Sequence, residues 1–181
     1  MPENLEIVIG PDSIKNRVKE VARAIDARLL SDGVKSISIV WLREGAKYIA
    51  ADILQNIATP CDVHSIKISS YGADGKPDKP RLIGGMCRIA NSHVLLIDDI
   101  LDTGATAKFA IDLLRHSGAR KIYTCFLLDK DNGISKPVSA DFVCFVVDNF
   151  FAVGYGLDSG GINRDLMGIF RKSENLKQDA K

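Results

Sequence analysis

The sequence carries almost no net charge. Its 24 Lys and Arg residues are balanced by 23 Asp and Glu residues, which leaves a formal charge of +1 at pH 7 over 181 residues. A strongly basic chain would indicate binding to nucleic acid or to an anionic membrane, and this balance favours neither. We therefore expect no nucleic-acid partner and no membrane partner. Any electrostatic binding must come from a local group of charges.

Long hydrophobic runs are missing as well. The longest apolar runs span a few residues, whereas a membrane helix needs roughly 20. The first residues, MPENLEIVIGPDS, contain no basic segment followed by an apolar one, so they lack the pattern of a signal peptide. The sequence thus predicts neither membrane insertion nor export.

Cysteine is scarce and shows no metal-binding spacing. None of Cys61, Cys87, Cys125 and Cys144 forms a C-x-x-C pair, which is typical of reduced thiols in a cytoplasmic protein rather than of a zinc site. Two phosphate-binding motifs, G-x-x-x-x-G-K-[ST] and G-x-G-x-x-G, are also absent. An NTPase or a dinucleotide-dependent oxidoreductase therefore loses its main support.

What the chain does contain is an alternation of helix-like and strand-like segments. With 46% apolar residues it can build one domain, residues 1–181, around a proper core. Helical spacing of apolar residues marks segments 13–29, 45–57 and 105–116, and short apolar segments mark strands at 36–42, 62–68, 94–97 and 121–128. This order predicts an α/β fold with a mostly parallel twisted sheet flanked by helices, whose ligands bind beyond the carboxyl ends of the strands.

The less regular segments complete this prediction. Residues 141–170 hold apolar stretches that favour shorter strands, a small hood over one end of the sheet. Residues 69–80, SSYGADGKPDKP, contain two glycines and two prolines and predict a mobile active-site loop. Residues 81–86 favour a short edge strand, and residues 172–181 a frayed tail.

In one stretch, VLLIDDILDTGAT (residues 94–106), an apolar segment typical of a buried strand is followed at once by three carboxylates, Asp98, Asp99 and Asp102. Unpaired buried carboxylates are costly, so we expect a cationic or hydroxyl-rich ligand nearby. Backbone N–H groups at a helix start can enclose a phosphate, while carboxylates accept hydrogen bonds from ribose hydroxyls. A sugar phosphate satisfies both halves of the motif. The alternative is a capped helix whose end donors are satisfied by Asp102 and its neighbour.

This stretch resembles the phosphoribosyl pyrophosphate signature of type I phosphoribosyltransferases. Two further stretches, IKNRVKEVARAI (residues 14–25) and VGYGLDSGGINRDL (residues 153–166), are similar to the hypoxanthine-guanine branch, and the resemblance runs from about residue 7 to 169. It implies a purine salvage enzyme that uses Mg²⁺ and converts phosphoribosyl pyrophosphate and a 6-oxopurine, hypoxanthine or guanine, into IMP or GMP plus pyrophosphate. It also implies a homodimer or homotetramer.

The resemblance also implies roles for individual residues. It makes Asp102 the catalytic acid/base group, and it assigns the ribose to Asp98 and Asp99 and the 5-phosphate to Asp102, Thr103, Gly104, Ala105 and Thr106. The base would contact Lys130, Phe151, Ala152 and Asp158, and the pyrophosphate would contact Arg43, Glu44, Gly45 and Arg164. Ser70 and Tyr71 would belong to the lid, and Asp158, Asp98 and Asp99 would bind the metal. A lysine offers donors only, which favours a 6-oxopurine over adenine.

One position departs from the family pattern. Glu44 stands where glycine is common, beside Arg43 in a lysine position. A side chain there would crowd a close backbone approach, so our hypothesis is that Glu44 points away from the ligand and only its backbone participates.

Other readings of these residues remain open. Lys130 could be a solvated loop charge, Phe151 a core residue, Asp158 a turn residue and Arg164 half of a surface ion pair. The whole chain could be a non-catalytic sensor of the sugar phosphate, although a regulator would not need Asp102 and would need a basic face. The same enzyme class could also act on another base, such as xanthine or adenine.

Overall fold

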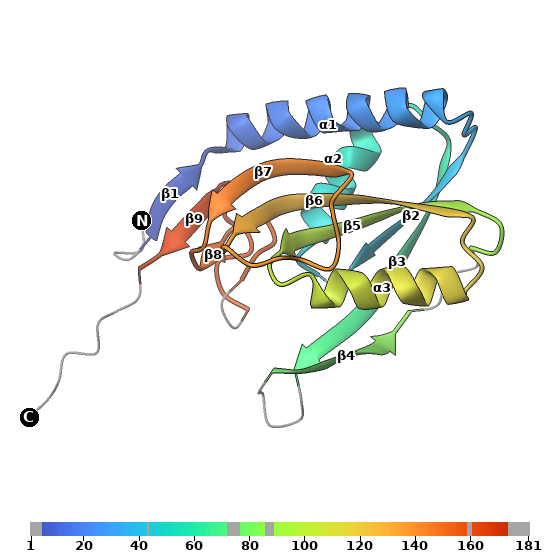
Figure 1. Cartoon of the computed structure of the whole chain (residues 1–181). Helices are drawn as coiled ribbons and strands as arrows, with labels where there is room; N and C mark the ends of the chain where they lie inside the picture. The colour runs from blue at the N-terminus through green and yellow to red at the C-terminus, as the bar shows by residue number, and fades with distance from the viewer. Residues whose placement is uncertain (1–4, 43, 72–76, 86–88, 159–160, 174–181) are drawn as a thin grey trace, which may run out of the picture.

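The computed structural model describes residues 5–42, 44–71, 77–85, 89–158 and 161–173 and folds them into two sheets and three helices (Figure 1). The central sheet has the strand order β4-β3-β2-β5-β6-β7. The strand bounds are β2 Ile37–Leu42, β3 Cys61–Tyr71, β4 Pro77–Gly84, β5 His93–Leu101, β6 Lys121–Asp131 and β7 Phe142–Asp148. All these strands run parallel except β4, which is antiparallel to β3. The predicted mostly parallel α/β fold is confirmed.

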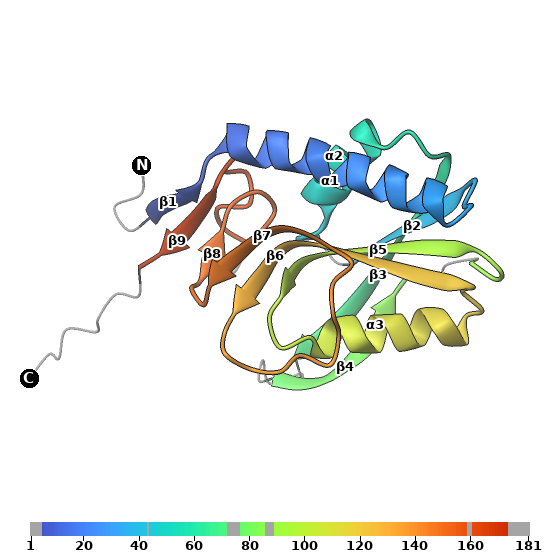
Figure 2. The ribbon, with the colours of Figure 1, turned by 45° about the horizontal axis from the view of Figure 1, so that its top comes forward.

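Helices cover both faces of this sheet. α1 (Pro11–Ser31) and α2 (Lys47–Asn56) lie on one face and α3 (Ala105–His116) on the other, as Figures 1 and 2 show. α3 buries Ala107, Ala110, Ile111 and Leu114, one stripe at helical spacing, against the sheet. Because β5 is covered on both sides, its residues 94–97 are fully buried and apolar, as a central parallel strand requires.

A second, antiparallel sheet has the order β1-β9-β8, with β1 Leu5–Ile9, β8 Ala152–Val153 and β9 Ile169–Lys172. Figures 1 and 2 both show it at the end of the central sheet toward which β5 and β6 point. This sheet is the predicted hood, but it has a strand from the start of the chain that the sequence analysis did not predict. We use "the hood" below for residues 150–172.

The segment at 141–147 was wrongly predicted to belong to the hood. It forms β7 and extends the central sheet in parallel with β6. Pairing with β6 satisfies its backbone on one side, and Arg17 of α1 donates hydrogen bonds to the carbonyls of Cys144 and Val143 at 2.8 and 3.0 Å. These long-range partners explain why an apolar run late in the chain lies in the main sheet.

Two predicted irregular segments are shorter than expected. β3 continues to Tyr71 and β4 begins at Pro77, so much of the predicted loop at 69–80 consists of two paired strands. Lys172, at the start of the predicted tail, pairs with Leu5 in the second sheet. Among the described residues, the helices are all too short or too polar to cross a membrane.

Candidate active site

The carboxylates of the motif lie at the carboxyl end of β5. Asp98 is 4% exposed and Asp99 is half-buried, and the strand continues past both of them to Leu101. Each side chain accepts a hydrogen bond from the next backbone N–H: Asp98 from Asp99 at 3.0 Å, and Asp99 from Ile100 at 2.8 Å. The sheet therefore holds both carboxylates at the edge where ligands of parallel α/β folds bind.

The loop between β2 and α2 packs directly against this edge. A Cβ atom at Gly45 would lie 1.8 Å from Asp99 Oδ2, so a side chain cannot be placed there without moving the carboxylate. Gly156 of the hood lies against the same loop, because its Cβ would be 2.5 Å from the Gly45 carbonyl oxygen. Three segments far apart in the sequence thus meet at Gly45.

The turn after β5 leads into α3 through a glycine with positive φ. Gly104 has φ +80 and directly precedes α3, which begins at Ala105. The Thr103 hydroxyl accepts the Ala105 N–H at 3.4 Å, and none of the described side chains makes a hydrogen bond as N-cap of α3. The positive end of the α3 dipole lies at this turn, which is compatible with the predicted anion site there.

Of the two residues in the capping interpretation, Thr103 accepts an N–H at the start of α3, but Asp102 does not cap this helix. Its Oδ2 lies 3.7 Å from Lys130 Nζ at the end of β6, while Asn132 Nδ2 donates a hydrogen bond to its Oδ1 at 2.8 Å. The neighbouring strands bring them together, because Leu101 of β5 pairs in register with Asp129 of β6. Two residues predicted for proton transfer and base recognition are therefore adjacent.

Lys130 is not the solvated loop charge that we considered as an alternative. It is only 9% exposed and lies within β6. A buried ammonium group requires charged or polar partners, and the Asp102 carboxylate is one. Sequence reasoning missed Asn132 beside it. The Asn-Gly pair at 132–133 is a turn signal that could have directed attention to it.

The hood presents one aromatic ring and one ion pair. Phe151 is 50% exposed, so it is not a core residue, whereas the following Ala152 is buried. The Arg164 guanidinium pairs with Asp158 at 3.1 Å, and the Gly161 N–H donates a hydrogen bond to the same carboxylate. Arg164 is thus half of an ion pair, and Asp158 accepts a turn hydrogen bond.

Tyr155 connects the hood to α2 and lies in an unusual backbone turn. Gly154, Tyr155 and Gly156 all have positive φ (95, 49 and 95), a conformation that a tyrosine seldom adopts. The Tyr155 hydroxyl donates a hydrogen bond to Asp52 Oδ2 at 2.6 Å, and its ring lies 5.8 Å from that of Tyr48. Burial, and then the contact with Asp52, raise the pKa of the Tyr155 phenol above its ordinary value of 10.0.

For several of the predicted site residues the structure describes no side-chain position or no contact with the rest of the site. Arg43 lies outside the described residues, as do the side chains of Ser70 and Tyr71. Glu44 is exposed, and its backbone carbonyl accepts a hydrogen bond from the Lys47 N–H at 3.3 Å. The proposed functions of these residues therefore remain predictions.

The predicted metal ligands do not form a closed cluster. Within the described part of the chain, no group of three His, Cys, Asp or Glu side chains could hold a metal ion, and Asp158 is occupied by Arg164. Magnesium usually binds through one or two carboxylates together with substrate phosphates and water. The adjacent carboxylates of Asp98 and Asp99 fit that requirement.

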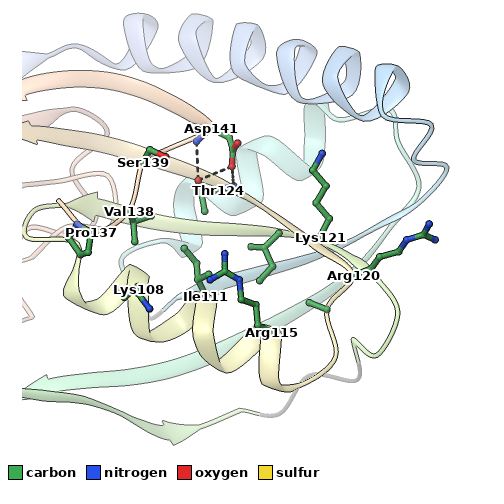
Figure 3. A pocket seen from close by; sticks show the side chains of 12 residues that line it. Lys108, Ile111, Arg115, Arg120, Lys121, Thr124, Pro137, Val138, Ser139 and Asp141 are labelled. Atoms are coloured by element: carbon green, nitrogen blue, oxygen red, sulfur yellow. Dashed lines mark hydrogen bonds between the residues drawn. The ribbon is translucent and has the colours of Figure 1, made fainter.

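A hollow of about 480 Å³ lies away from this site, between α3, β6 and the connection from β6 to β7 (Figure 3). Lys108 and Arg115 line it from α3, but both pair with Asp112. The Asp141 carboxylate accepts hydrogen bonds from the N–H and the hydroxyl of Thr124. The hollow contains none of the described residues predicted for the site, so we place the candidate site at the ends of β5 and β6.

Comparison with known proteins gives consistent matches. The sequence model of the phosphoribosyl transferase domain matches residues 12–160. The hypoxanthine-guanine phosphoribosyltransferase of Aquifex aeolicus (strain VF5) is 34% identical over 93% of this chain and 94% of that protein. The enzyme of the same name from Bacillus subtilis (strain 168) is 29% identical over 89% of both chains.

Solved structures agree with the sequence matches. The hypoxanthine phosphoribosyltransferase of Trypanosoma cruzi in complex with the product IMP has a TM-score of 0.85 and 28% identity, and covers 96% of this chain and 97% of that one. A hypoxanthine-guanine phosphoribosyltransferase from Bacillus anthracis has a TM-score of 0.84 and 27% identity, covering 94% of this chain and 100% of its own. The similarity extends over the fold as a whole.

Proposed function

The chain belongs to the phosphoribosyl transferase domain family, and we propose that it is a purine salvage enzyme. It transfers the phosphoribosyl group of phosphoribosyl pyrophosphate to hypoxanthine or guanine, giving IMP or GMP plus pyrophosphate. The observation that carries this proposal is the distance of 3.7 Å between Nζ of the buried Lys130 and Oδ2 of Asp102. Asp102 lies between β5 and Gly104. Near full-length similarity to enzymes of that name supports the proposal.

In this proposal Lys130 and Asp102 act on the base. The Lys130 ammonium donates a hydrogen bond to the 6-oxygen of the purine, and a donor-only side chain there discriminates against a 6-amino group. One nitrogen of the five-membered ring attacks the anomeric carbon while the bond from that carbon to pyrophosphate breaks. Pyrophosphate leaves with the bonding electrons, and the proton on the other nitrogen of the same ring passes to the Asp102 carboxylate, a general base.

The sugar phosphate occupies the β5–α3 segment. Asp98 and Asp99 accept hydrogen bonds from the ribose hydroxyls, and their charge favours the cationic sugar of the transition state. The 5-phosphate lies on the turn formed by residues 103–106, where Gly104 has positive φ and the α3 dipole favours an anion. Magnesium, when bound, neutralises charge on the leaving pyrophosphate, and Asp98 and Asp99 are the residues that would hold it, with Asp158 as a further candidate.

The hood and the loops complete the site. The half-exposed Phe151 ring stacks on the purine face, and Ala152 and Asp158 lie at the ring edge. Arg164 exchanges its carboxylate partner for pyrophosphate, which also contacts Arg43 and the backbone at Glu44 and Gly45. Ser70 and Tyr71 belong to a lid that excludes water from the reacting centre.

A non-catalytic binder of the sugar phosphate is the alternative class. The arrangement of Lys130 and Asp102 favours the enzyme, because sugar-phosphate binding alone needs neither a base-reading lysine nor a proton acceptor. We further propose that the chain is cytoplasmic and forms a homodimer or homotetramer. The described cysteines, Cys61, Cys125 and Cys144, are free thiols, which suits a reducing compartment.

The first test is nucleotide formation by the purified protein with magnesium and phosphoribosyl pyrophosphate, with hypoxanthine, guanine, xanthine and adenine offered separately. We expect turnover of hypoxanthine or guanine. In Asp102→Asn, which keeps the side-chain volume, kcat should fall by about 100-fold or more because the proton acceptor is lost.

Binding of phosphoribosyl pyrophosphate, measured by calorimetry, should change by less than about threefold in this variant, since its main contacts remain. Absence of turnover with every base, while the sugar phosphate still binds, would favour the non-catalytic alternative. Unchanged kcat in Asp102→Asn would remove Asp102 from the acid/base role.

A further inference from the structure

Asn132 donates hydrogen bonds directly to the proposed proton acceptor. Its Nδ2 donates to Asp102 Oδ1 at 2.8 Å and to the Asp102 carbonyl oxygen at 3.2 Å. One amide nitrogen therefore donates to two acceptors of the same residue. Asp102 Oδ1 is occupied, and Oδ2 is left facing Lys130.

The orientation of the Asn132 amide is itself determined. Its side-chain oxygen accepts a hydrogen bond from the Ile134 N–H at 3.3 Å, which makes a short Asx turn. Because the oxygen must face that N–H, the amide nitrogen must face Asp102. Asn132 thus performs two separable tasks: it closes its own turn, and it holds the carboxylate that directly follows β5.

A lysine further along this segment fixes the turn to both strands of the site. The Lys136 ammonium donates hydrogen bonds to the Leu101 carbonyl oxygen at 3.0 Å, to the Lys130 carbonyl oxygen and to the Asp129 carboxylate. Its three donors are therefore used, and its side chain is largely buried. The turn at 132–136 cannot shift without breaking contacts on the backbones next to Asp102 and Lys130.

We propose that Asn132 is a positioning residue, which aims the Asp102 carboxylate at the base and keeps one of its oxygens open for the proton. The proposal rests on the function proposed above. The distance of 3.7 Å between Lys130 Nζ and Asp102 Oδ2 is too long for a hydrogen bond, so Oδ2 still has room to accept a proton from a base bound at Lys130. Without the Asn132 amide, the half-exposed carboxylate could rotate and pair fully with Lys130, which would occupy both groups.

The charged groups around Asp102 are consistent with this role. Lys130 faces it from β6, and Lys136 reaches the adjacent Leu101 carbonyl while paired with Asp129. Lys130 lies nearest, and it attracts the carboxylate toward the position that the base must use. A neutral amide donor on the other oxygen opposes that rotation.

The two tasks of Asn132 are separated by two variants. Asn132→Asp keeps an oxygen for the Ile134 N–H but replaces the donor to Asp102 with a second carboxylate. Asn132→Ala removes both the turn contact and the donor without adding charge. Asn16→Asp, on the exposed side of α1, makes the same change of charge far from the site and serves as the control.

The measurements are kcat, the KM for phosphoribosyl pyrophosphate, and the urea midpoint of unfolding, with hypoxanthine and guanine as bases. Since misaligning a general base costs rate rather than sugar-phosphate binding, kcat should fall by about 100-fold in Asn132→Asp and about tenfold in Asn132→Ala, with KM within about twofold of the wild type. Asn16→Asp should behave as the wild type.

Which of the two variants loses more kcat distinguishes a positioning role of Asn132 from a role in the turn alone. If the turn alone mattered, Asn132→Ala would lose more activity than Asn132→Asp, and the proposal would be overturned; wild-type kcat in Asn132→Asp would overturn it as well. Should Asn132→Asp not fold, a fall in kcat at unchanged KM in Asn132→Ala still supports the role, and a fall only in the unfolding midpoint contradicts it. A wild-type protein inactive with every base would instead defeat the proposed function itself.

Discussion

The β5–α3 segment and the hood hold their backbones in place by different means. In residues 93–116, the carboxylates, the glycine turn and the helix start follow one another in the sequence, and regular sheet and helix hydrogen bonds hold them. In the hood, three consecutive residues have positive φ, and Tyr155, the middle one, is held by Asp52, a partner far away in the sequence, although Asp158 and Arg164 pair with each other inside the hood. The backbone of the first region is thus built from regular elements, with Asp102 alone held by side chains of a distant segment, whereas the backbone turn of the hood depends on contacts with the rest of the molecule.

This difference has consequences for how each region responds to change. A strand-turn-helix unit keeps its geometry as long as its own backbone hydrogen bonds persist. The hood keeps its geometry only while Gly45 and α2 remain in place, because Gly156 and Tyr155 contact them. Substitutions that disturb these contacts with Gly45 and α2 should therefore destabilise the hood, and the hood's own sequence does not reveal those contacts.

The largest effect is expected from Gly156→Ala. The new Cβ would lie 2.5 Å from the Gly45 carbonyl oxygen at a residue with φ +95, so both the contact and the backbone are strained. We expect the free energy of unfolding to fall by about 3 kcal/mol or more. Urea denaturation followed by fluorescence measures it.

Gly33→Ala is the matched control, because Gly33 also has positive φ (+70) but an added Cβ there would meet nothing within 4 Å. Positive φ alone should cost about 1–2 kcal/mol. Equal losses in the two variants would mean that the close approach of Gly156 to Gly45 contributes nothing.

Gly45→Ala tests the junction of the two regions. Its Cβ would lie 1.8 Å from Asp99 Oδ2, and a side chain can move aside where a backbone cannot. Activity should therefore suffer more than stability: a displaced ribose-binding carboxylate should lower kcat/KM by about 100-fold, or about 2.7 kcal/mol of transition-state binding.

Steady-state kinetics and a urea titration on the same preparation separate the two effects. Gly10→Ala, where a Cβ would meet nothing within 4 Å and φ is −75, is the neutral comparison. A Gly45→Ala protein with wild-type kcat/KM would show that Asp99 tolerates displacement and has no essential contact with the substrate.

The smallest effect is expected from Tyr155→Phe, which removes one hydrogen bond to Asp52. At neutral pH the loss should be about 1 kcal/mol of unfolding free energy. Because the pKa of the folded-state phenol is raised above 10.0, the wild type keeps its proton in the fold and loses stability as the pH rises past that value. The Phe variant lacks this loss.

The stability difference between the wild type and Tyr155→Phe should therefore narrow above pH 10. Unfolding midpoints measured from neutral pH to about pH 11 follow this range, with unfolded-state tyrosine ionisation as the driving term. A difference that stays constant or widens over the range would contradict the burial of the Tyr155 hydroxyl.

Sequence reasoning succeeded where the pattern repeats over a short distance. The helix at 105–116 and the strand beginning near Val94 were predicted closely, because apolar spacing reports burial directly. It failed for β1, for the placement of β7 and for Asn132, since none of these has a local signature of its partner. The assigned roles of the site residues remain predictions until the variants are measured.

By itself the sequence determined the α/β alternation and the acidic strand end followed by a glycine turn, because hydrophobic period and turn chemistry are encoded in neighbouring residues. Only the tertiary structure decided that Lys130 and Asn132 meet Asp102, that Gly45 receives both Asp99 and Gly156, and that the first strand pairs with the last. Those contacts depend on strand order, register and close packing, which arise when distant segments bury surface together.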